Sequence, residues 1–180
     1  MPVMGLKEQL EALAEKYDIE VEEDSTELDL EDKELEELPE CVCDLAAVEE
    51  LFLDKNALAS LPEGIGAMGA LRELNVRQNA LESLPESIGR LPALEGLFLQ
   101  ENKLVELPDL AGCSALRGIN VNQNRLRGLP AGMCKCAAME GIYGDFNEIG
   151  ELPEQIGALA ELEEVRHCAP PEGGHTRHRS

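Results

Sequence analysis

Aromatic side chains are scarce in this sequence of 180 residues: they make up 3 %, and tryptophan is missing altogether. Leucine, isoleucine, valine and alanine must therefore build any hydrophobic core, and such side chains suit a narrow interior. Long apolar runs are missing too, since no stretch reaches the roughly 18 residues that a membrane-spanning helix needs. The first residues, 1–8, also lack the apolar segment of a secretory signal peptide.

Basic residues are few: Lys and Arg total 15 against 37 Asp and Glu, which gives a net charge of −22. The imbalance is concentrated in residues 1–50, which hold 19 acidic and 3 basic residues. Nucleic acid and anionic membrane surfaces are therefore excluded as expected partners, because affinity for phosphates comes from Lys and Arg. With neither a signal peptide nor an Asn-x-Ser/Thr glycosylation site, we expect a cytoplasmic protein, with the nucleus as the alternative location.

A unit of 23 residues recurs along the chain with the pattern L-x-x-L-x-L-x-x-N-x-L-x-x-L-P-x-x-I-G-x-L. Self-similarity at a fixed period predicts a solenoid, in which each copy is one structural unit stacked on the next. A degenerate copy begins near Ser25 and a truncated one at Leu162, and the copy from Leu94 has lost one residue within 108–114. The full copies begin at Val48, Leu71, Leu94, Leu116 and Met139.

Each repeated position has a physical role. The L-x-L alternation at unit positions 4 and 6, as at Leu74 and Val76, predicts a short strand with one buried face. The amide at position 9 can donate and accept, so stacked copies predict a ladder of hydrogen bonds to turning backbone. The L-P-x-x-I-G segment predicts one outer helical turn, with proline at its first position and glycine at its end. The position-9 residues are Asn56, Asn79, Asn102, Asn124 and Asn147.

On these motifs the chain resembles the leucine-rich repeat proteins, specifically the 23-residue L-P-x-x-I-G-x-L class, over about residues 25–168. That class includes intracellular Ras-pathway scaffolds, plant intracellular Ras-group-related proteins and some bacterial proteins. The resemblance implies an α/β fold: a right-handed solenoid with a parallel sheet on its concave side and short helical turns outside. It implies no catalytic residues.

The segment before the repeats, residues 1–24, is expected to be a capping helix with a linker. Leu6, Leu10, Leu13 and Tyr17 recur at helical spacing, and a terminal repeat must cover its open core face. A dimerising or partner-binding helix is the alternative.

Acids and a polar tail mark the two ends of the repeats. The degenerate first copy carries Glu27, Asp29, Glu31 and Asp32, either to protect an edge strand from pairing or to dock a basic partner. Residues 169–180 are expected to form a flexible tail. Cys168 and three histidines near this tail match no known metal-ligand spacing, so we expect no metal there.

Two C-x-C pairs suggest a zinc site at first sight. Cys41 and Cys43 lie four copies away from Cys134 and Cys136. At a strand spacing of about 4.8 Å the separation is roughly 19 Å, whereas a Zn–S bond measures about 2.3 Å. We therefore expect both pairs to be small apolar fillers in the outer segments. The sequence also shows no nucleophile paired with a base and no phosphate-binding loop, so no enzymatic activity is expected.

Unit positions 3, 5, 7 and 8 are expected to project from the concave sheet. Aromatic residues gather at positions 5 and 8, where partners commonly anchor, although strands also favour aromatics without a partner. The glycines at position 3 of later copies are expected to leave room beside Phe98 and Tyr143. Phe146 is expected to fold into the core, because Gly144 leaves a gap there. The predicted partner-binding residues are Phe52, Asn75, Arg77, Phe98, Gln100, Asn120, Asn122 and Tyr143.

These observations predict a non-enzymatic protein–protein interaction module, such as an adaptor or a regulatory scaffold. It is expected to bind a protein partner on its concave face, to be a monomer by itself and to need no cofactor or metal. The alternative is a structural subunit of a large assembly, docked through its ends.

Overall fold

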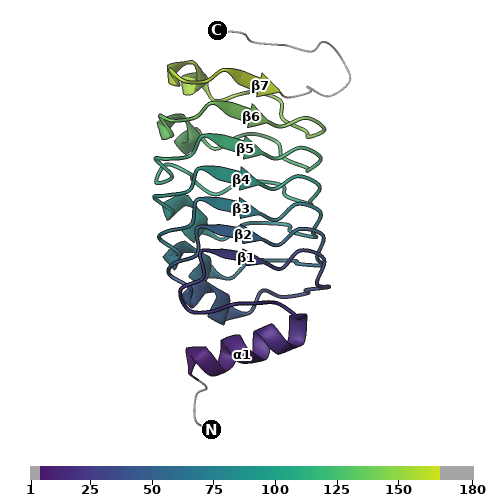
Figure 1. Ribbon diagram of the computed structural model, residues 1–180. Helices are drawn as coiled ribbons and strands as arrows, with labels where there is room; N and C mark the ends of the chain where they lie inside the picture. The colour runs from purple at the N-terminus through teal and green to yellow at the C-terminus, as the bar shows by residue number, and fades with distance from the viewer. Residues whose placement is uncertain (1–4, 167–180) are drawn as a thin grey trace.

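The computed structural model describes residues 5–166, which form an elongated stack of turns with an α-helix at the N-terminal end (Figure 1). The strands form a single parallel sheet in chain order. The register pairs each residue with the same unit position of the next copy, for instance Leu51 with Leu74. The predicted solenoid and the phase of its repeat are therefore confirmed. The strands are β1 (Glu27–Asp29), β2 (Glu50–Phe52), β3 (Glu73–Asn75), β4 (Gly96–Phe98), β5 (Gly118–Asn120), β6 (Gly141–Tyr143) and β7 (Glu164–Arg166).

Aliphatic side chains fill the interior of the stack. Residues at unit positions 4 and 6, such as Leu74 and Val76, are fully buried, and the buried core of the described residues contains no aromatic side chain. Leucine, isoleucine and valine build the core as expected, whereas alanine does not contribute to it and methionine and cysteine do. Each fully buried aliphatic side chain stabilises the fold by about 1.5–3 kcal/mol, so the repeated layers supply most of the stabilisation.

Single turns of 3-10 helix lie on the outer side. In η3 the helix begins at Glu86, and Pro85 precedes it as an extended N-cap residue. The prediction that proline takes the first helical position was therefore wrong by one residue. The carbonyl of Pro85 accepts the N–H of Ile88 at 3.1 Å, so proline closes the turn from outside it. Within residues 5–166 these turns are η1 (Glu40–Asp44), η2 (Glu63–Ala67), η3 (Glu86–Arg90), η4 (Ala131–Lys135) and η5 (Glu154–Ala158).

Gly89 in η3 serves close packing rather than helix termination. It lies within η3, and a Cβ there would overlap the backbone carbonyl oxygen of Asp109 in the following copy. That copy is the one with a lost residue, and its outer segment has no helical turn. The shortened chain packs directly on η3, where Gly112 donates its N–H to the carbonyl of Gly89 at 3.0 Å.

The predicted asparagine ladder runs along the stack. The amide oxygen of Asn102 accepts the N–H of Leu81 at 3.0 Å in the preceding copy. Its amide nitrogen donates to the carbonyls of Val76 at 2.9 Å and Leu99 at 3.0 Å. Each asparagine therefore joins two adjacent turns and satisfies backbone groups that the strands leave unpaired.

The N-terminal helix α1 (Leu6–Tyr17) covers the first turn of the stack (Figure 1). Leu10 and Leu13 are buried in the common core, and Tyr17 packs against it. The predicted capping helix is confirmed, and its apolar face is occupied by the repeat rather than free for a second helix. No helix within the described range is long and apolar enough to cross a membrane. The predicted tail, residues 169–180, lies outside the described residues.

Candidate protein-binding face

Side chains at unit position 5 form one column across the concave sheet. Phe52 pairs in register with Asn75, and Asn75 with Phe98. Asn120 follows, and then Tyr143. Each of these side chains is half-buried. The structure thus brings the five predicted position-5 residues together on one surface, with aromatic and amide side chains alternating.

The rings of the last two aromatics lie over their own strands. A Cβ built on Gly96 would come within 3.0 Å of Cε2 of Phe98, and one on Gly141 within 3.0 Å of Cε2 of Tyr143. The expectation that the position-3 glycines leave room beside the rings holds at Gly118, where no heavy atom lies within 4 Å of a built Cβ, whereas the rings themselves occupy the room at Gly96 and Gly141. Phe98 and Tyr143 therefore turn toward the position-3 glycines of their own strands.

Tyr143 is held in place by two charged neighbours. Its hydroxyl donates to Oε2 of Glu164 at 3.1 Å, and the guanidinium of Arg166 lies 5.8 Å from the ring centre. Arg166 also pairs with Glu164, at 2.7 Å between Nε and Oε1. Burial and the nearby carboxylate of Glu164 raise the pKa of the Tyr143 hydroxyl. A ring fixed in this way loses little side-chain entropy when a partner binds.

Two amide oxygens in the centre of this face are buried and have no hydrogen-bond partner within the described residues. They are Oδ1 of Asn75 and Oε1 of Gln100. Asn75 lies between Phe52 and Phe98 in the position-5 column. An unsatisfied buried polar group costs about 1–3 kcal/mol, so these two oxygens lower the stability of the fold.

Asp54, at unit position 7, is a buried carboxylate that the sequence prediction missed. It is 1 % exposed. Its Oδ1 accepts the backbone N–H of Arg77 at 3.2 Å, and its Oδ2 lies 3.4 Å from Nε of Arg77. Burial raises the pKa of Asp54 to about 6, although Arg77 acts in the opposite direction. The sequence offered no signal for this burial, because the partners of Asp54 come from the next copy.

Asn120 and Asn122 are less available to a partner than predicted. The amide oxygen of Asn122 accepts the N–H of Asp145 at 2.6 Å, in the same way that Asp54 serves the next copy. The amide oxygen of Asn120 accepts the N–H of Asn122 at 3.1 Å. Both residues lie on the predicted face, but their amide oxygens already accept hydrogen bonds from backbone N–H groups.

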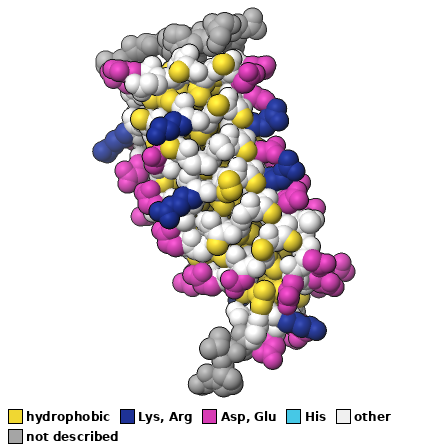
Figure 2. Space-filling view, turned by 90° about the vertical axis from the view of Figure 1, so that its left-hand side faces the viewer, with side chains coloured by type: hydrophobic (Ala, Val, Ile, Leu, Met, Phe, Trp, Pro, Cys, Tyr) yellow, Lys and Arg dark blue, Asp and Glu magenta, His cyan; other side chains and the backbone are white. Residues whose placement is uncertain are grey.

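Acidic side chains occupy position 3 in the first half of the sheet. Glu27, Glu50 and Glu73 stand in register on β1, β2 and β3. Burial, followed by the charge of Glu50, raises the pKa of Glu73. Position 3 is therefore acidic in the first three strands of the concave sheet. On the side of the molecule that carries the 3-10 turns, acidic and basic side chains line the margins, with hydrophobic ones between them (Figure 2).

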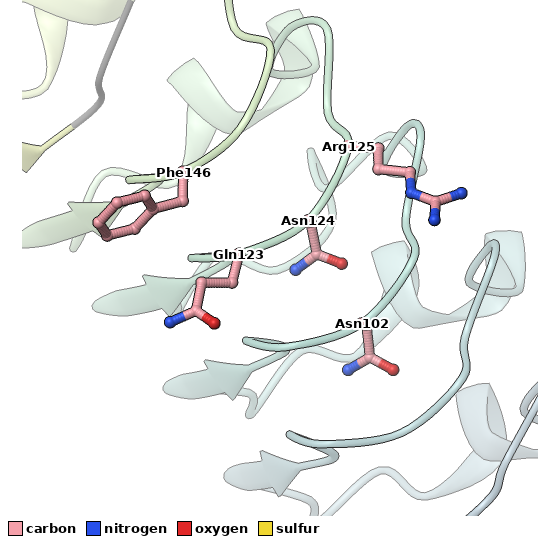
Figure 3. Close-up of a pocket in the computed structure, with 5 residues that line it drawn as sticks. All are labelled: Asn102, Gln123, Asn124, Arg125 and Phe146. Carbon is pink, nitrogen blue, oxygen red and sulfur yellow. The ribbon is translucent and has the colours of Figure 1, made fainter.

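Phe146 contradicts its prediction as a core residue, since it is 70 % exposed. The gap expected at Gly144 is filled instead by Ile149, whose Cδ1 would lie 3.1 Å from a Cβ at Gly144. Phe146 lines a hollow of about 520 Å³ at the loops that follow the strands (Figure 3). The sequence held a signal, because position 8 is polar in every earlier copy. The hollow is lined by Asn102, Gln123, Asn124, Arg125 and Phe146.

The cysteines of the described range behave largely as expected. Cys41 and Cys43 lie in η1, and Cys136 follows η4; all three are buried. Cys134 is only half-buried. Burial raises the pKa of Cys43 to about 12 and that of Cys136 to about 11, which keeps these thiols protonated and unreactive. Residues 5–166 contain no cluster of side chains able to hold a metal ion. Cys168 lies outside this range.

The comparisons with known proteins agree with this architecture. A leucine rich repeat family model matches residues 47–104 and 69–126. Among solved structures, the leucine-rich repeat domain of the type III effector XopL has a TM-score of 0.76 at 22 % identity, over 89 % of this chain and 56 % of that one. A search of curated proteins finds no match.

Two further structures are similar at slightly higher identity. YopM from Yersinia enterocolitica has a TM-score of 0.65 at 29 % identity, over 85 % of this chain and 31 % of that one. The plant peptide hormone receptor RGFR1, solved in complex with RGF2, has a TM-score of 0.71 at 28 % identity, over 78 % of this chain and 24 % of that one. This chain thus spans about half or less of the structures it resembles, and its fold is that of a leucine-rich repeat solenoid.

Proposed function

We propose that the protein is a non-enzymatic protein-binding module, an adaptor or a regulatory scaffold, whose concave face contacts its partner. The observation that carries the proposal is the centre of that face. There, the amide of Asn75 on β3 stands in register between Phe52 on β2 and Phe98 on β4. Aromatic side chains that alternate with amides suit a polypeptide, which offers both apolar side chains and backbone amides.

The similar structures support a binding role without identifying a partner. The receptor RGFR1 was solved with RGF2 bound, so a protein of the same fold holds another molecule. The cytoplasmic location and the monomeric state expected from the sequence belong to this proposal. The 23-residue class shared with Ras-pathway scaffolds belongs to it as well.

The first prediction tests the concave face directly. A photo-crosslinking amino acid placed at Phe98 should capture a partner from native extract, whereas the same group at Glu86 in the outer turn η3 should not. Phe98→Ala and Tyr143→Ala should each weaken binding of the captured partner by about 2 kcal/mol, the loss typical of an interface hot spot. Glu86→Ala is the matched control and should bind normally. Equal capture from both positions contradicts the proposal.

One observation favours the alternative, an assembly subunit docked through its ends. The last turn keeps Ile156, Leu162 and Val165 only half-buried, whereas the equivalent residues Ile88, Leu94 and Leu97 of an inner copy are fully buried. A stable complex of fixed stoichiometry that survives Phe98→Ala and Tyr143→Ala would establish the alternative.

A further inference from the structure

Phe146 has a conformation and an exposure that the fold does not require. Its φ is 60°, in the left-handed region that bulky residues avoid, at a cost of roughly 1–2 kcal/mol. Earlier copies adopt the same left-handed turn with polar side chains, for example Gln78 and Gln123. Within residues 5–166, only Phe146 and Val105 are large hydrophobic side chains that are exposed. The repeat itself therefore does not call for an apolar ring at this position.

The hollow beside Phe146 offers three unused groups. Asn102 and Asn124 line it, but their amides belong to the ladder that joins adjacent turns. Gln123 and Arg125 have side chains that make no hydrogen bond or salt bridge to any residue the structure describes. Figure 3 shows Phe146 and Gln123 pointing to one side of the loops and Arg125 to the other. A ligand that contacts the side chains of Phe146, Gln123 and Arg125 together must cross the loop, and an extended peptide segment can do so.

The charge of the hollow is opposite to that of the chain. No acidic residue lines it, although acids outnumber bases by 37 to 15 in the sequence. Lys103 takes the same unit position one turn earlier, next to Leu104, whose carbonyl accepts the N–H of Arg125 at 2.9 Å. Arg127 follows two residues later and meets Glu148 only at 3.7 Å, with both side chains largely exposed. Glu148 takes the same unit position one turn later, so the basic charge at this edge lies at Lys103 and Arg125.

We propose that this hollow binds an acidic, extended segment of a partner protein that carries an aromatic or branched apolar side chain. The apolar side chain packs on the ring of Phe146. A carboxylate of the segment pairs with Arg125, and the amide of Gln123 meets its backbone in either hydrogen-bonding sense. This site is separate from the position-5 column, so the partner segment it holds need not be the one that meets Phe98.

An array of labelled peptides tests the proposal. Each peptide alternates Glu with a central Phe, Tyr, Trp or Leu, and matched peptides replace Glu by Lys or the central residue by Ser. The full chain should bind acidic peptides that keep the apolar residue, and rising salt should weaken binding because the charges are exposed. Binding of none of these peptides, or equal binding of the Lys series, would overturn the proposal.

Single substitutions test whether the peptides bind at Phe146 and Arg125. Phe146→Gln restores the residue type found at Gln78 and Gln123 in the same turn, so the fold is kept. This variant and Arg125→Gln should each reduce affinity about tenfold, the effect of losing one anchor worth about 1.4 kcal/mol. Arg90→Gln in the outer turn η3 and Phe98→Ala on the concave face are the controls, and both should bind within about twofold of the unmodified protein.

Two further outcomes show whether the peptide binds the hollow or the concave column, and whether the hollow binds a partner segment or a second copy of this chain. If Phe98→Ala abolishes peptide binding while Phe146→Gln does not, the peptide binds the concave column and the inference fails, while the proposed function stands. If light scattering shows dimers that Phe146→Gln disrupts, and the peptides do not bind, the occupant is a second copy of this chain and the inference fails in its choice of partner. Loss through Phe146→Gln and Arg125→Gln in a monomeric protein supports it.

Discussion

Asp54 shows how one side chain can make the stability of this fold depend on pH. Its pKa is about 6 in the folded protein and 3.8 in an unfolded chain, so the folded state binds the proton more tightly. Stability should therefore fall as pH rises through the window from about 3.8 to about 6, and should regain that amount on acidification. The penalty at neutral pH is on the order of 3 kcal/mol, since one pKa unit corresponds to 1.36 kcal/mol.

Replacing Asp54 by asparagine should remove this dependence. The structure contains its own precedent, because Asn122 accepts a backbone N–H of the next copy as Asp54 does. We expect Asp54→Asn to raise the free energy of unfolding at pH 7.5 and to have little effect at pH 4, as measured by urea denaturation at both values. The difference between the variant and the original protein isolates Asp54 from the general acidic repulsion. An equal effect at both pH values would contradict the assignment.

Asn102 and Gln100 provide a matched pair of polar residues with opposite expectations. The Asn102 amide holds backbone groups of two adjacent turns, and it is 9 % exposed. Asn102→Ala should therefore cost about 1–3 kcal/mol in the free energy of unfolding. Gln100 instead buries an amide oxygen that has no partner among the described residues. Gln100→Ala should not destabilise the protein, and equal losses in both variants would show that the ladder contributes nothing special.

Among the elements, the outer turns differ in how tightly they pack against neighbouring copies. Two glycines at the same unit position, Gly89 and Gly157, have different surroundings and can be used to test this. Gly89 in η3 touches the backbone of the shortened copy, so Gly89→Ala should force the two segments apart and cost about 1–3 kcal/mol. Gly157 in η5 has no heavy atom within 4 Å of a built Cβ. Gly157→Ala should stabilise by about 0.4–1 kcal/mol, because the unfolded chain loses freedom. Melting temperatures of the two variants should move in opposite directions.

At the element scale, the sequence was enough to place every strand. The positions of the leucines decide which residues face the core. A shift of one residue would move every side chain of a strand to the opposite face of the sheet, so the pattern allows only one register. The helix over residues 6–17 and the asparagine ladder followed from the same logic. What each repeated residue does inside its own turn was harder to predict. Pro85 and Gly89 act through contacts with neighbouring copies, which no single copy reveals.

The candidate site was predictable in outline only. Register places Phe52, Asn75 and Phe98 in one column, and the period alone foretold this. The direction of the side chains could not be predicted: the ring of Phe98 turns toward Gly96, and Phe146 points outward because Ile149 fills the gap beside Gly144. The burial of Asp54 was equally hidden, since an acid at position 7 reads as a surface residue until the next copy supplies its partner.

For the whole molecule, the N-terminal end is the place where the stack must be closed. Leu10 and Leu13 of α1 belong to the same core as Leu28 and Val42 of the first turns. A charge at Leu13 would lie unpaired against that core, so Leu13→Asp should cost at least about 3 kcal/mol and expose apolar surface to a hydrophobic dye. Glu11→Ala, on the exposed side of α1, is the control and should change stability by less than about 0.5 kcal/mol.

The same variant separates the two functions considered for α1. If the helix closes the stack, Leu13→Asp lowers the urea midpoint and broadens the transition, because the first turns lose their cover and unfold before the rest. If the helix instead served mainly to join a second chain, Leu13→Asp would leave the midpoint unchanged and alter only the mass measured by light scattering. The burial of Leu10 and Leu13 within one chain favours closure. Unchanged unfolding in Leu13→Asp would therefore refute the capping role.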